Sequence, residues 1–292
     1  MTRRTIVLVL GLGLSIALLS GCAVNPVTGD EELMFFSPDK DVELGRKYAP
    51  LVEKELGGRI SEEGIQSYVN QIGQRIAGFC QRPDLSYHFG VIEEGGANAL
   101  ALPGGYIYIT RDLLKEFKTE AQLASVLSHE IGHVVARDTL AAMSQQIGMT
   151  AIMLAAQAGG SSDLASGTRF LHAVLGLQYS REDEKEADLA GLSYMTQAGY
   201  DPNGMVETMQ ILEKLQTYRP VEFFSTHPNP ESRIAYLQDR IAMRYASLGG
   251  LKKGEEEYRQ KVLAPLNERK RRFNEQPPEP GRSETSEPGR QN

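Results

Sequence analysis

Residues 125–136 have the sequence SVLSHEIGHVVA, which contains the pattern H-E-x-x-H within a helix predicted over about 119–136. Side chains four residues apart on a helix lie roughly 40° apart around the axis and about 6 Å apart along it. The imidazoles of His129 and His133 can therefore bind one ion, and zinc favours such nitrogen ligands. Glu130 lies beside them, where its carboxylate can take a proton from a water molecule. The structural alternative is a surface helix that carries two histidines and a glutamate.

The rest of this helix has an apolar face and a face of small residues. The small residues share the histidine face, where they allow a second element to pack closely. Gly132 costs about 1 kcal/mol relative to alanine inside a helix, so a gain in packing should offset it. The apolar residues are Leu123, Leu127 and Val134, and the small ones are Ser125, Gly132 and Ala136.

A catalytic zinc takes three protein ligands, and the acidic segment 180–188, SREDEKEAD, offers a third one. On a helical wheel, Glu184 and Asp188 face inward, and an inward-facing acid needs a partner. We predict Glu184 as the third ligand, and Asp188 as the acceptor of the distal N–H of a ligating histidine. A solvated acidic helix start, which the helix dipole favours, is the alternative. The inward face also contains Ala187, Gly191, Met195 and Ala198, and the outward face contains Glu182, Lys185, Glu186 and Leu189.

Hydrophobic periodicity and turn residues predict the other elements. Pro103 places its strand at a sheet edge, because proline cannot donate to the ladder. The segment 140–157 is predicted to be either a core helix or an active-site cover. The chain is thus expected to be α+β, mainly helical with a small antiparallel sheet. Helices are expected over residues 37–56, 61–76, 140–157, 179–198, 201–215 and 229–245, and strands over residues 86–92 and 99–110.

Composition narrows the class of protein. The chain has 292 residues, 41% hydrophobic and 24% charged, as in a globular protein. Its 38 acidic residues outnumber its 31 basic ones, which argues against a general nucleic-acid binder. Two cysteines cannot form a disulfide framework. Cys80 lies late in an apolar helical pattern and is interpreted as a small buried residue.

The first 21 residues have the organisation of an export signal. A basic start is followed by an apolar run over residues 5–19 and by Leu19-Ser20-Gly21-Cys22, which resembles the bacterial lipobox. This resemblance implies cleavage before Cys22 and acylation of that residue. Ala23 follows where an aspartate would indicate retention at the inner membrane, so the expected location is the periplasmic side of the outer membrane. The alternatives are ordinary secretion and an uncleaved anchor.

The chain divides into four expected parts. Residues 1–21 are a lipoprotein signal peptide, residues 22–36 a tether, residues 37–262 the folded domain, and residues 263–292 a disordered tail rich in Pro, Glu, Arg, Gly and Ser. The basic run 269–272 is either a solvated helix end or a contact for phosphate or lipid.

The two-part motif His129-Glu130-x-x-His133 and Glu184-x-x-Ala187-Asp188 resembles that of the HtpX-like and type-1 CAAX prenyl protease zinc metallopeptidases. The resemblance covers roughly residues 22–246. Flanking pieces that also look like this family are Asn98–Gly105 and Thr226-His227-Pro228…Arg233, and Asn25-Pro26-Val27-Thr28-Gly29 with the lipobox suggests its periplasmic lipoprotein branch. The chain lacks the multiple membrane spans and the helical-repeat module of some members, so neither prenylated substrates nor partners bound by such repeats are inferred.

The resemblance implies a zincin-like metallopeptidase domain with one Zn²⁺ per chain, whose edge strand flanks the active-site helix. It assigns zinc to His129, His133 and Glu184, and the general base to Glu130. It gives Asp188 a role as proton donor in some members, whereas our wheel geometry favours an orienting role. The edge strand would bind extended polypeptides as an added strand, or would pair within the fold instead. Its residues are Asn98, Ala99, Leu100, Ala101 and Leu102.

The sequence allows three interpretations of His227. In the resembling family this position lies near the metal, where it either stabilises the oxyanion or acts as a removable fourth ligand. The third reading is a loop histidine with a backbone partner.

The function expected from these observations is that of a lipid-anchored zinc endopeptidase that cleaves unfolded or misassembled envelope proteins. Its partners would be extended polypeptides, the membrane through lipidated Cys22, and outer-membrane assembly machinery, without nucleic acid. The rival reading is a lipid-anchored periplasmic chaperone or assembly factor with a mainly structural zinc. A metallohydrolase other than a protease is a weaker third reading, because it gives the edge strand no purpose.

Overall fold

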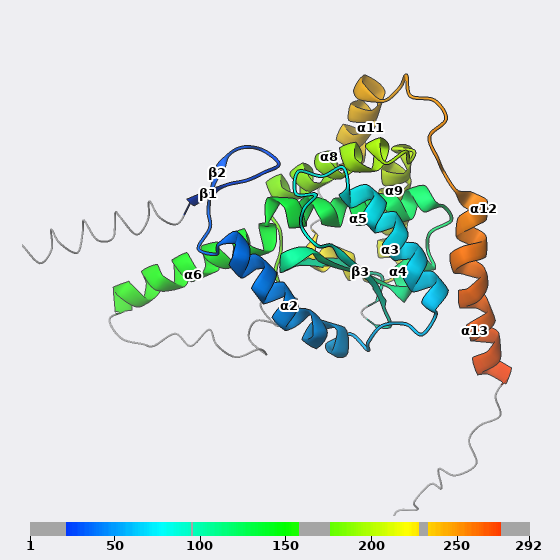
Figure 1. Cartoon of the computed structure of the whole chain (residues 1–292), viewed down its shortest axis with the longest axis horizontal. Helices are drawn as coiled ribbons and strands as arrows, with labels where there is room; N and C mark the ends of the chain where they lie inside the picture. Colours follow the sequence, from blue (N-terminus) through cyan, green and yellow to red (C-terminus); the bar gives the residue numbers. More distant parts are fainter. Residues whose placement is uncertain (1–21, 95, 158–175, 228–232, 276–292) are drawn as a thin grey trace, which may run out of the picture.

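The computed structural model describes residues 22–94, 96–157, 176–227 and 233–275, and the expected signal peptide lies outside them. The described elements confirm the α+β class, with many helices and little sheet (Figure 1). They are β1 (Cys22–Val24), β2 (Glu31–Leu33), α2 (Pro38–Glu55), α3 (Glu63–Ala77), β3 (His88–Ile92), β4 (Ala99–Leu102), a 3-10 turn (Pro103–Gly105), β5 (Tyr106–Thr110), α4 (Arg111–Leu114), α5 (Glu120–Ala136), α6 (Asp138–Gln157), α8 (Arg181–Gln197), α9 (Asn203–Tyr218), α10 (Phe223–Thr226), α11 (Arg233–Arg244), α12 (Glu255–Tyr258), a π-helical turn (Arg259–Leu263) and α13 (Ala264–Glu275).

The central sheet has the strand order β3-β5-β4. Strand β4 pairs antiparallel with β5, whereas β3 pairs parallel with β5, so the sheet is mixed and not purely antiparallel as expected. The reason is that the chain passes from β3 to the far edge of the sheet and returns through β5 in the middle. Among the described strands, β4 is therefore an edge, as Pro103 predicted.

The single strand expected over residues 99–110 is instead a hairpin. Pro103 has no N–H to donate, and Gly104 and Gly105 have φ angles of 72° and 87°, a region that glycine adopts readily. These three residues reverse the chain between β4 and β5. The turn also packs against α2, because Gly104 N donates to the buried carboxylate of Asp41.

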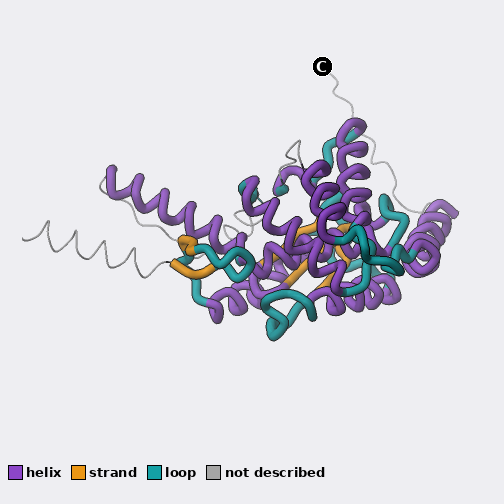
Figure 2. The backbone as a smooth tube through the Cα atoms, turned by 90° about the horizontal axis from the view of Figure 1, so that it is seen from above, coloured by secondary structure: helices purple, strands orange, loops and turns teal. Residues whose placement is uncertain are grey.

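The sheet separates two apolar clusters, and Figure 2 shows its strands among the helices. One face, which includes Ala99, Ala101 and Ile107, packs in the main core with α3 and α5. The opposite face, which includes Leu100 and Tyr108, packs with α2 and the start of α6. Alternate residues of β4 thus point to opposite sides, as strand geometry requires. The start of α6 belongs to this second core, where Leu140, Ala141 and Met143 are buried.

Helices α5 and α8 cross closely through small residues. A Cβ atom added to Gly132 would lie 2.9 Å from Ala187 Cα, and one added to Gly191 would lie 2.9 Å from His129 N. The close approach expected at the histidine face is therefore present. It brings the acids of α8 to the histidines of α5.

The segment 22–36 is not a free tether, which corrects the expectation. Strands β1 and β2 form a hairpin, and Met34 is buried in the second core. Asn25 is buried and donates to Glu32 and Glu186, and Phe35 N donates to Ser144 Oγ. The segment folds back because these polar and apolar groups find partners on α6 and α8. Cys22, at its start, is exposed.

The disordered tail expected from residue 263 is wrong for residues 263–275, which are helical. Tyr258, Val262 and Leu266 are buried, and the hydroxyl of Tyr258 donates to Leu114 O. These apolar side chains recur at helical spacing within a polar composition, and packing against the core holds the helix. Arg269 pairs with Glu62 and Glu93. Residues 276–292 lie outside the described part of the chain.

The helices of the described ranges are all too short or too polar to cross a membrane.

Candidate metal centre

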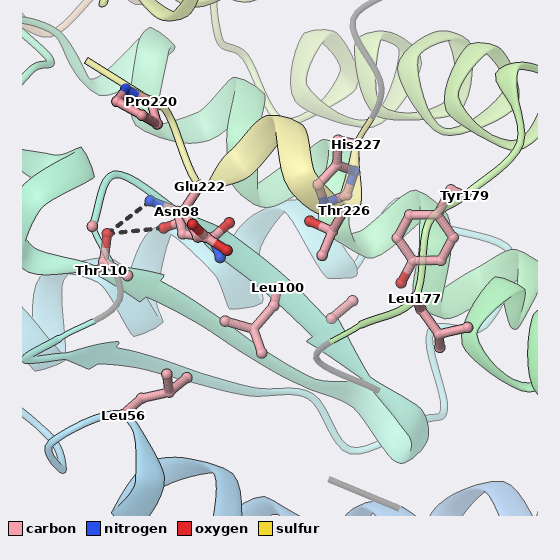
Figure 3. Close-up of a pocket in the computed structure, with 12 residues that line it drawn as sticks. Leu56, Asn98, Leu100, Thr110, Leu177, Tyr179, Pro220, Glu222, Thr226 and His227 are labelled. Atoms are coloured by element: carbon pink, nitrogen blue, oxygen red, sulfur yellow. Dashed lines mark hydrogen bonds between the residues drawn. The ribbon is translucent and has the colours of Figure 1, made fainter. Parts of the chain in front are cut away.

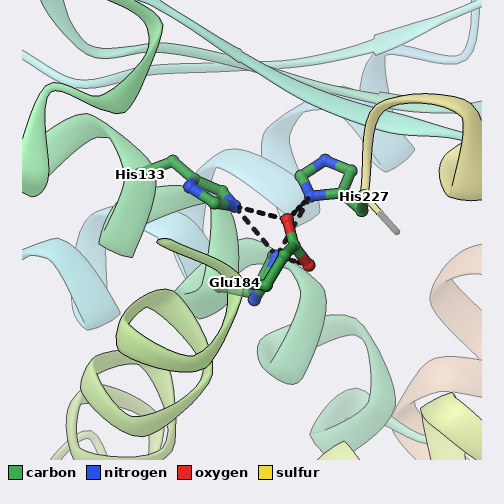
Figure 4. A group of neighbouring side chains, drawn as sticks. His133, Glu184 and His227 are labelled. Carbon is green, nitrogen blue, oxygen red and sulfur yellow. Dashed lines mark hydrogen bonds and ion pairs between the residues drawn. The ribbon is translucent and has the colours of Figure 1, made fainter. Parts of the chain in front are cut away.

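Four side chains from three segments converge in the interior of the protein. His129 and His133 come from α5, Glu184 from α8, and His227 from the residue after α10 (Figure 4). One donor atom from each lies within 4.8 Å of all the others, and all four residues are buried. The structure thus brings together the three ligands predicted from the sequence and adds His227 to them.

The spacing of these atoms fits a tetrahedral zinc ion. His129 Nε2 lies 3.1 Å from His133 Nε2 and 3.3 Å from His227 Nδ1, and Glu184 Oε1 lies 3.4 Å from His133 Nε2. Zinc–nitrogen distances of about 2.0–2.1 Å place tetrahedral ligand atoms about 3.3 Å from one another. Glu184 Oε1 and His227 Nδ1 are closer together, at 2.7 Å. Three imidazoles and one carboxylate are a donor set that zinc favours.

The protonation tendencies of the histidines bear on metal binding. Burial lowers the pKa of His129 and of His227, which favours the neutral imidazole that binds a metal. Burial also acts to lower the pKa of His133, but the carboxylates of Asp138 and Glu184 outweigh it and raise this pKa. A metal ion that binds His133 therefore has to displace a proton.

Glu130 is a buried carboxylate without a hydrogen-bond partner among the described residues. Neither of its carboxylate oxygens accepts a hydrogen bond from these residues, and His227 Nε2 lies 3.5 Å from Glu130 Oε1. Burial raises the pKa of Glu130, since the charged form has lost its hydration. A carboxylate left in this state costs free energy unless the site supplies it with a water or a substrate group. It fits the position of a proton acceptor beside the metal ligands.

Each histidine of α5 has an acid on its other ring nitrogen. His129 Nδ1 lies 2.9 Å from Asp188 Oδ1, and His133 Nδ1 lies 2.6 Å from Asp138 Oδ2. Such carboxylates fix the ring orientation and tautomer of a ligating histidine. Asp188 thus lies where the helical wheel placed it, next to a ligand and not at the open side of the site. Asp138 lies in the equivalent position beside His133.

Arg233 of α11 neutralises Glu184 and Asp188, the two fully buried acids of α8. Its Nη1 donates to Glu184 Oε2 at 2.6 Å, and its Nε and Nη2 donate to the two oxygens of Asp188 at 2.8 Å and 2.7 Å. Burial alone would raise the pKa of Asp188, but the charge of Arg233 outweighs burial and holds that pKa well below its usual range. The hydroxyl of Tyr236 also donates to Asp188. Arg233 therefore holds the ligand and the orienting acid in place.

His227 is held over the metal site from several sides. Its ring stacks on Phe223 with a centroid distance of 4.3 Å. The segment that carries it is fixed by two main-chain bonds, from Phe223 N to Ala97 O and from Tyr179 N to Thr226 O. Its ring nitrogens face Glu184 and Glu130, not the backbone. The structure therefore argues against the third interpretation of His227, in which its ring binds only a backbone group.

The edge strand β4 directs main-chain groups away from its neighbour β5. Thr110 N donates to Asn98 O across the pair. Because residues of an antiparallel strand alternate, the main-chain groups of Ala99 and Ala101 point to the open edge. Two of these main-chain groups have side-chain partners. Asn98 Oδ1 accepts a hydrogen bond from Ala99 N, and Thr139 Oγ1 lies 3.4 Å from Ala101 O. A cavity runs along this edge and reaches His227 (Figure 3).

The sequence reasoning missed three residues of this site. Arg233 belongs to a flanking motif, but the sequence predicts no role for it. Asp138 lies five residues after His133, just past the end of the same helix. An acid so close to a predicted ligand is a local signal for a side chain that orients it. Tyr179, whose ring stacks on His133 at 4.0 Å, had no signal in its local sequence.

Comparison with known proteins agrees with this geometry. A model of peptidase family M48 matches residues 64–241. The chain is 30% identical over 207 residues to the beta-barrel assembly-enhancing protease of Escherichia coli (strain K12), which covers 67% of this chain and 41% of that protein. It is 31% identical over 221 residues to the mitochondrial metalloendopeptidase OMA1 of Schizosaccharomyces pombe, covering 73% and 65%. Metalloprotease LoiP of Escherichia coli is 28% identical over 149 residues, covering 50% and 59%. The chain spans less than half the length of the beta-barrel assembly-enhancing proteases that it matches.

Proposed function

The chain belongs to peptidase family M48, and from that membership and the geometry of the metal centre we propose that this zinc metalloendopeptidase cleaves unfolded or misassembled proteins of the bacterial envelope. The observation that carries the chemistry is Glu130, a buried carboxylate that has no hydrogen-bond partner among the described residues and lies beside four converging donors. Bound zinc supplies a Lewis acid that polarises the scissile carbonyl and acidifies water.

We assign the following roles to the residues of the chain. His129, His133 and Glu184 hold the metal, and Glu130 takes a proton from the attacking water and passes it to the leaving nitrogen. Asp188 orients His129 through its Nδ1. The high proton affinity that burial gives to Glu130 suits a group that accepts a proton and then donates it.

His227 is proposed to be the removable fourth ligand. Its Nδ1 lies among the donor atoms, and its Nε2 faces the general base. In this position it occupies the place that a water and a substrate carbonyl need. Movement of the segment from Arg219 to His227 would open the site, and the displaced imidazole could then stabilise the oxyanion.

The cellular setting is part of the proposal. Several relatives are named as proteases that enhance β-barrel assembly, and the lipobox at Cys22 supports a lipid anchor on the periplasmic side of the outer membrane. Partners would then include outer-membrane assembly machinery. Labelled palmitate should enter the wild-type protein and not a Cys22→Ala variant, and equal labelling of both would contradict the anchor.

One observation favours the rival function of a chaperone or assembly factor. Four protein donors converge here, and four is the number that closes a structural zinc site. The two functions differ in their need for Glu130, because a structural zinc does not require a general base.

The deciding experiment is Glu130→Gln in the full chain. The variant should keep stoichiometric zinc and lose at least about 100-fold in cleavage of an unfolded protein, since general-base catalysis contributes that much or more. Glu182→Gln, at an exposed acid of α8, is the matched control and should cleave normally. Unchanged cleavage by Glu130→Gln would reject the assigned base. If Glu130→Gln still rescues cells with envelope defects, the chaperone function is the correct one.

A further inference from the structure

The N-terminal hairpin exposes apolar side chains beside the expected lipid anchor. Cys22 is exposed, and Val24 of β1 and Phe35, two residues after β2, are 61% and 43% exposed. All three residues line one surface cavity of about 550 Å³. Apolar side chains that gather on a surface mark a contact with a membrane or with another molecule.

Helix α6 lies against the same hairpin and projects beyond it. Phe35 N donates to Ser144 Oγ, and the buried side chains that are described for α6 lie in its first two turns. The later part of α6 extends past β1 and β2, away from the other described helices (Figure 1 and Figure 2). From Ile147 to the helix end at Gln157, this part spans about 16 Å.

The sequence of this projecting part, residues 147–157, is apolar. It reads IGMTAIMLAAQ, and the chain has no charged residue over the whole of residues 139–157. Apolar surface of this kind is unfavourable in water. The projecting part is too short to cross a bilayer, whose hydrocarbon core is about 30 Å thick, but it is long enough to lie along a bilayer surface.

We propose that the projecting part of α6, together with Val24 and Phe35, lies in the surface of the lipid bilayer to which Cys22 is anchored. The inference rests on the lipid anchor of the proposed function and adds a second membrane contact to it. A lipid on Cys22 holds this end of the domain at the bilayer, so the apolar groups around it meet lipid first. With two contacts the domain faces the membrane in one orientation, whereas an anchor alone leaves it free to rotate.

The charged residues at this end indicate which lipid surface fits. Asp30 and Glu31 of the hairpin are exposed acids. Arg82 and Arg137 are the cations among the residues that line the cavity, and both pair with Asp41. An anionic headgroup therefore gains little here, and the contact is apolar. A zwitterionic lipid such as phosphatidylcholine should suffice, and salt should not weaken the contact.

The test measures how deeply three sites lie in the bilayer. The protein, acylated in a bacterial host, is bound to phosphatidylcholine vesicles and carries a dye on one introduced cysteine. Cys80 is buried, and acylated Cys22 has no free thiol, so the dye reports the introduced site. Brominated phosphatidylcholine should quench the dye at Val24→Cys and at Met153→Cys at least about threefold more than at Met243→Cys, because only the first two sites enter the hydrocarbon.

Met243 is the matched control because it is also apolar and is 81% exposed, but it lies on α11, far from α6 (Figure 1). Equal quenching at the three sites would overturn the proposal, and so would quenching that appears only when phosphatidylglycerol is added. A dye at Met153→Cys that is shielded from water but is not quenched would place α6 against protein instead of lipid.

Charged substitutions provide a second measurement with the dye kept at Val24→Cys. The double variant Ile152→Glu/Met153→Glu should lower its quenching at least about twofold, since a charged side chain in hydrocarbon is costly. Met243→Glu should leave it unchanged, and equal quenching in both variants would overturn the role of α6. Dye uptake by wild-type protein would reject the acylation of Cys22 alone. The contrast between Met153→Cys and Met243→Cys, read on Cys22→Ser protein with vesicles, then decides the membrane contact.

Discussion

Arg233 and Asp188 form a two-bond ion pair in the interior of the protein, with donor–acceptor distances of 2.8 Å and 2.7 Å. The third guanidinium nitrogen of Arg233 reaches Glu184 at 2.6 Å. One cation thus serves two buried acids, one of which belongs to the metal-binding group. The stability of the site before metal binding depends on this arginine.

Replacement of Arg233 by alanine should strongly destabilise the zinc-free protein. It would leave two buried carboxylates without their partner, and loss of one side of a buried ion pair costs about 3–5 kcal/mol. Urea denaturation of the zinc-free protein measures this. Zinc should recover part of the loss, because the ion supplies positive charge at the same place.

Arg244→Ala is the control for this change, since Arg244 lies at the exposed end of the same helix and its loss should change stability little. Arg233→Lys should fall between the two, because an ammonium cannot make the forked contact. A free energy of unfolding that stays at the wild-type value in Arg233→Ala would show that the pair contributes nothing.

The metal-binding group divides into residues that local sequence could place and residues that it could not. His129, His133 and Glu184 follow from helical geometry, because the two histidines lie four residues apart on α5 and Glu184 lies on the inward face of α8. Arg233 and Tyr179 depend on how α11 and the segment before α8 meet the zinc helix. This packing joins segments that are far apart in the sequence. No local sequence pattern therefore predicts it.

Asp138→Asn should weaken zinc binding by about 10–100-fold, which is the usual effect of losing the carboxylate that orients a ligating histidine. The asparagine keeps the shape of the side chain but lacks the charge that faces His133 Nδ1. Competition with a chelator of known affinity measures the change. Asp112→Asn, on the surface of α4, should bind zinc as the wild type does. Equal affinities for Asp138→Asn and wild type would mean that His133 is oriented by packing alone.

The crossing of α5 and α8 makes a prediction about two glycines. Gly132→Ala places a Cβ 2.9 Å from Ala187 Cα, so the helices must move apart, and we expect a destabilisation of about 1–3 kcal/mol. Alanine also brings a gain of about 1 kcal/mol to a helix, so the net destabilisation should be up to about 2 kcal/mol. Gly64→Ala, in α3, has no atom within 4 Å of the new Cβ and should be neutral or stabilising by up to about 1 kcal/mol. Chemical denaturation of both variants distinguishes them, and a stabilised Gly132→Ala would show that the helices separate at no cost.

The errors at the two ends of the domain have one physical cause. Composition indicated a tether over residues 22–36 and a disordered tail from residue 263. A few apolar side chains, Met34 in the first segment and Val262 and Leu266 in the second, were enough to dock each segment onto the core. Average polarity hides such isolated anchors, because docking depends on a matching surface elsewhere in the chain. The hairpin in residues 99–110 differs from the predicted single strand for another reason: Pro103 indicates a sheet edge, but Pro103, Gly104 and Gly105 together also form a turn.

The contact between the N-terminal hairpin and α8 should weaken as the pH rises. Glu32 accepts a hydrogen bond from Asn25, and Glu186 and Asp183 of α8 and Asp30 of the turn lie around it. Burial raises the pKa of Glu32 above its ordinary value of 4.5; Asp183 and Asp30 add to this rise, and the bond from Asn25 opposes it.

The pKa of Glu32 is higher in the folded state than in the unfolded state. Its contribution to stability is therefore complete at a pH below the unfolded-state pKa, and it is lost as the pH rises through the folded-state pKa. Glu32→Gln removes this titration. The variant should therefore match the wild type in melting temperature below pH 4.5 and exceed it increasingly as the pH rises above that value. Glu31→Gln, at an exposed position of the same strand, should differ from the wild type by an amount that does not grow with pH. A difference for Glu32→Gln that is constant or shrinks as the pH rises would mean that folding does not raise the pKa of this carboxyl.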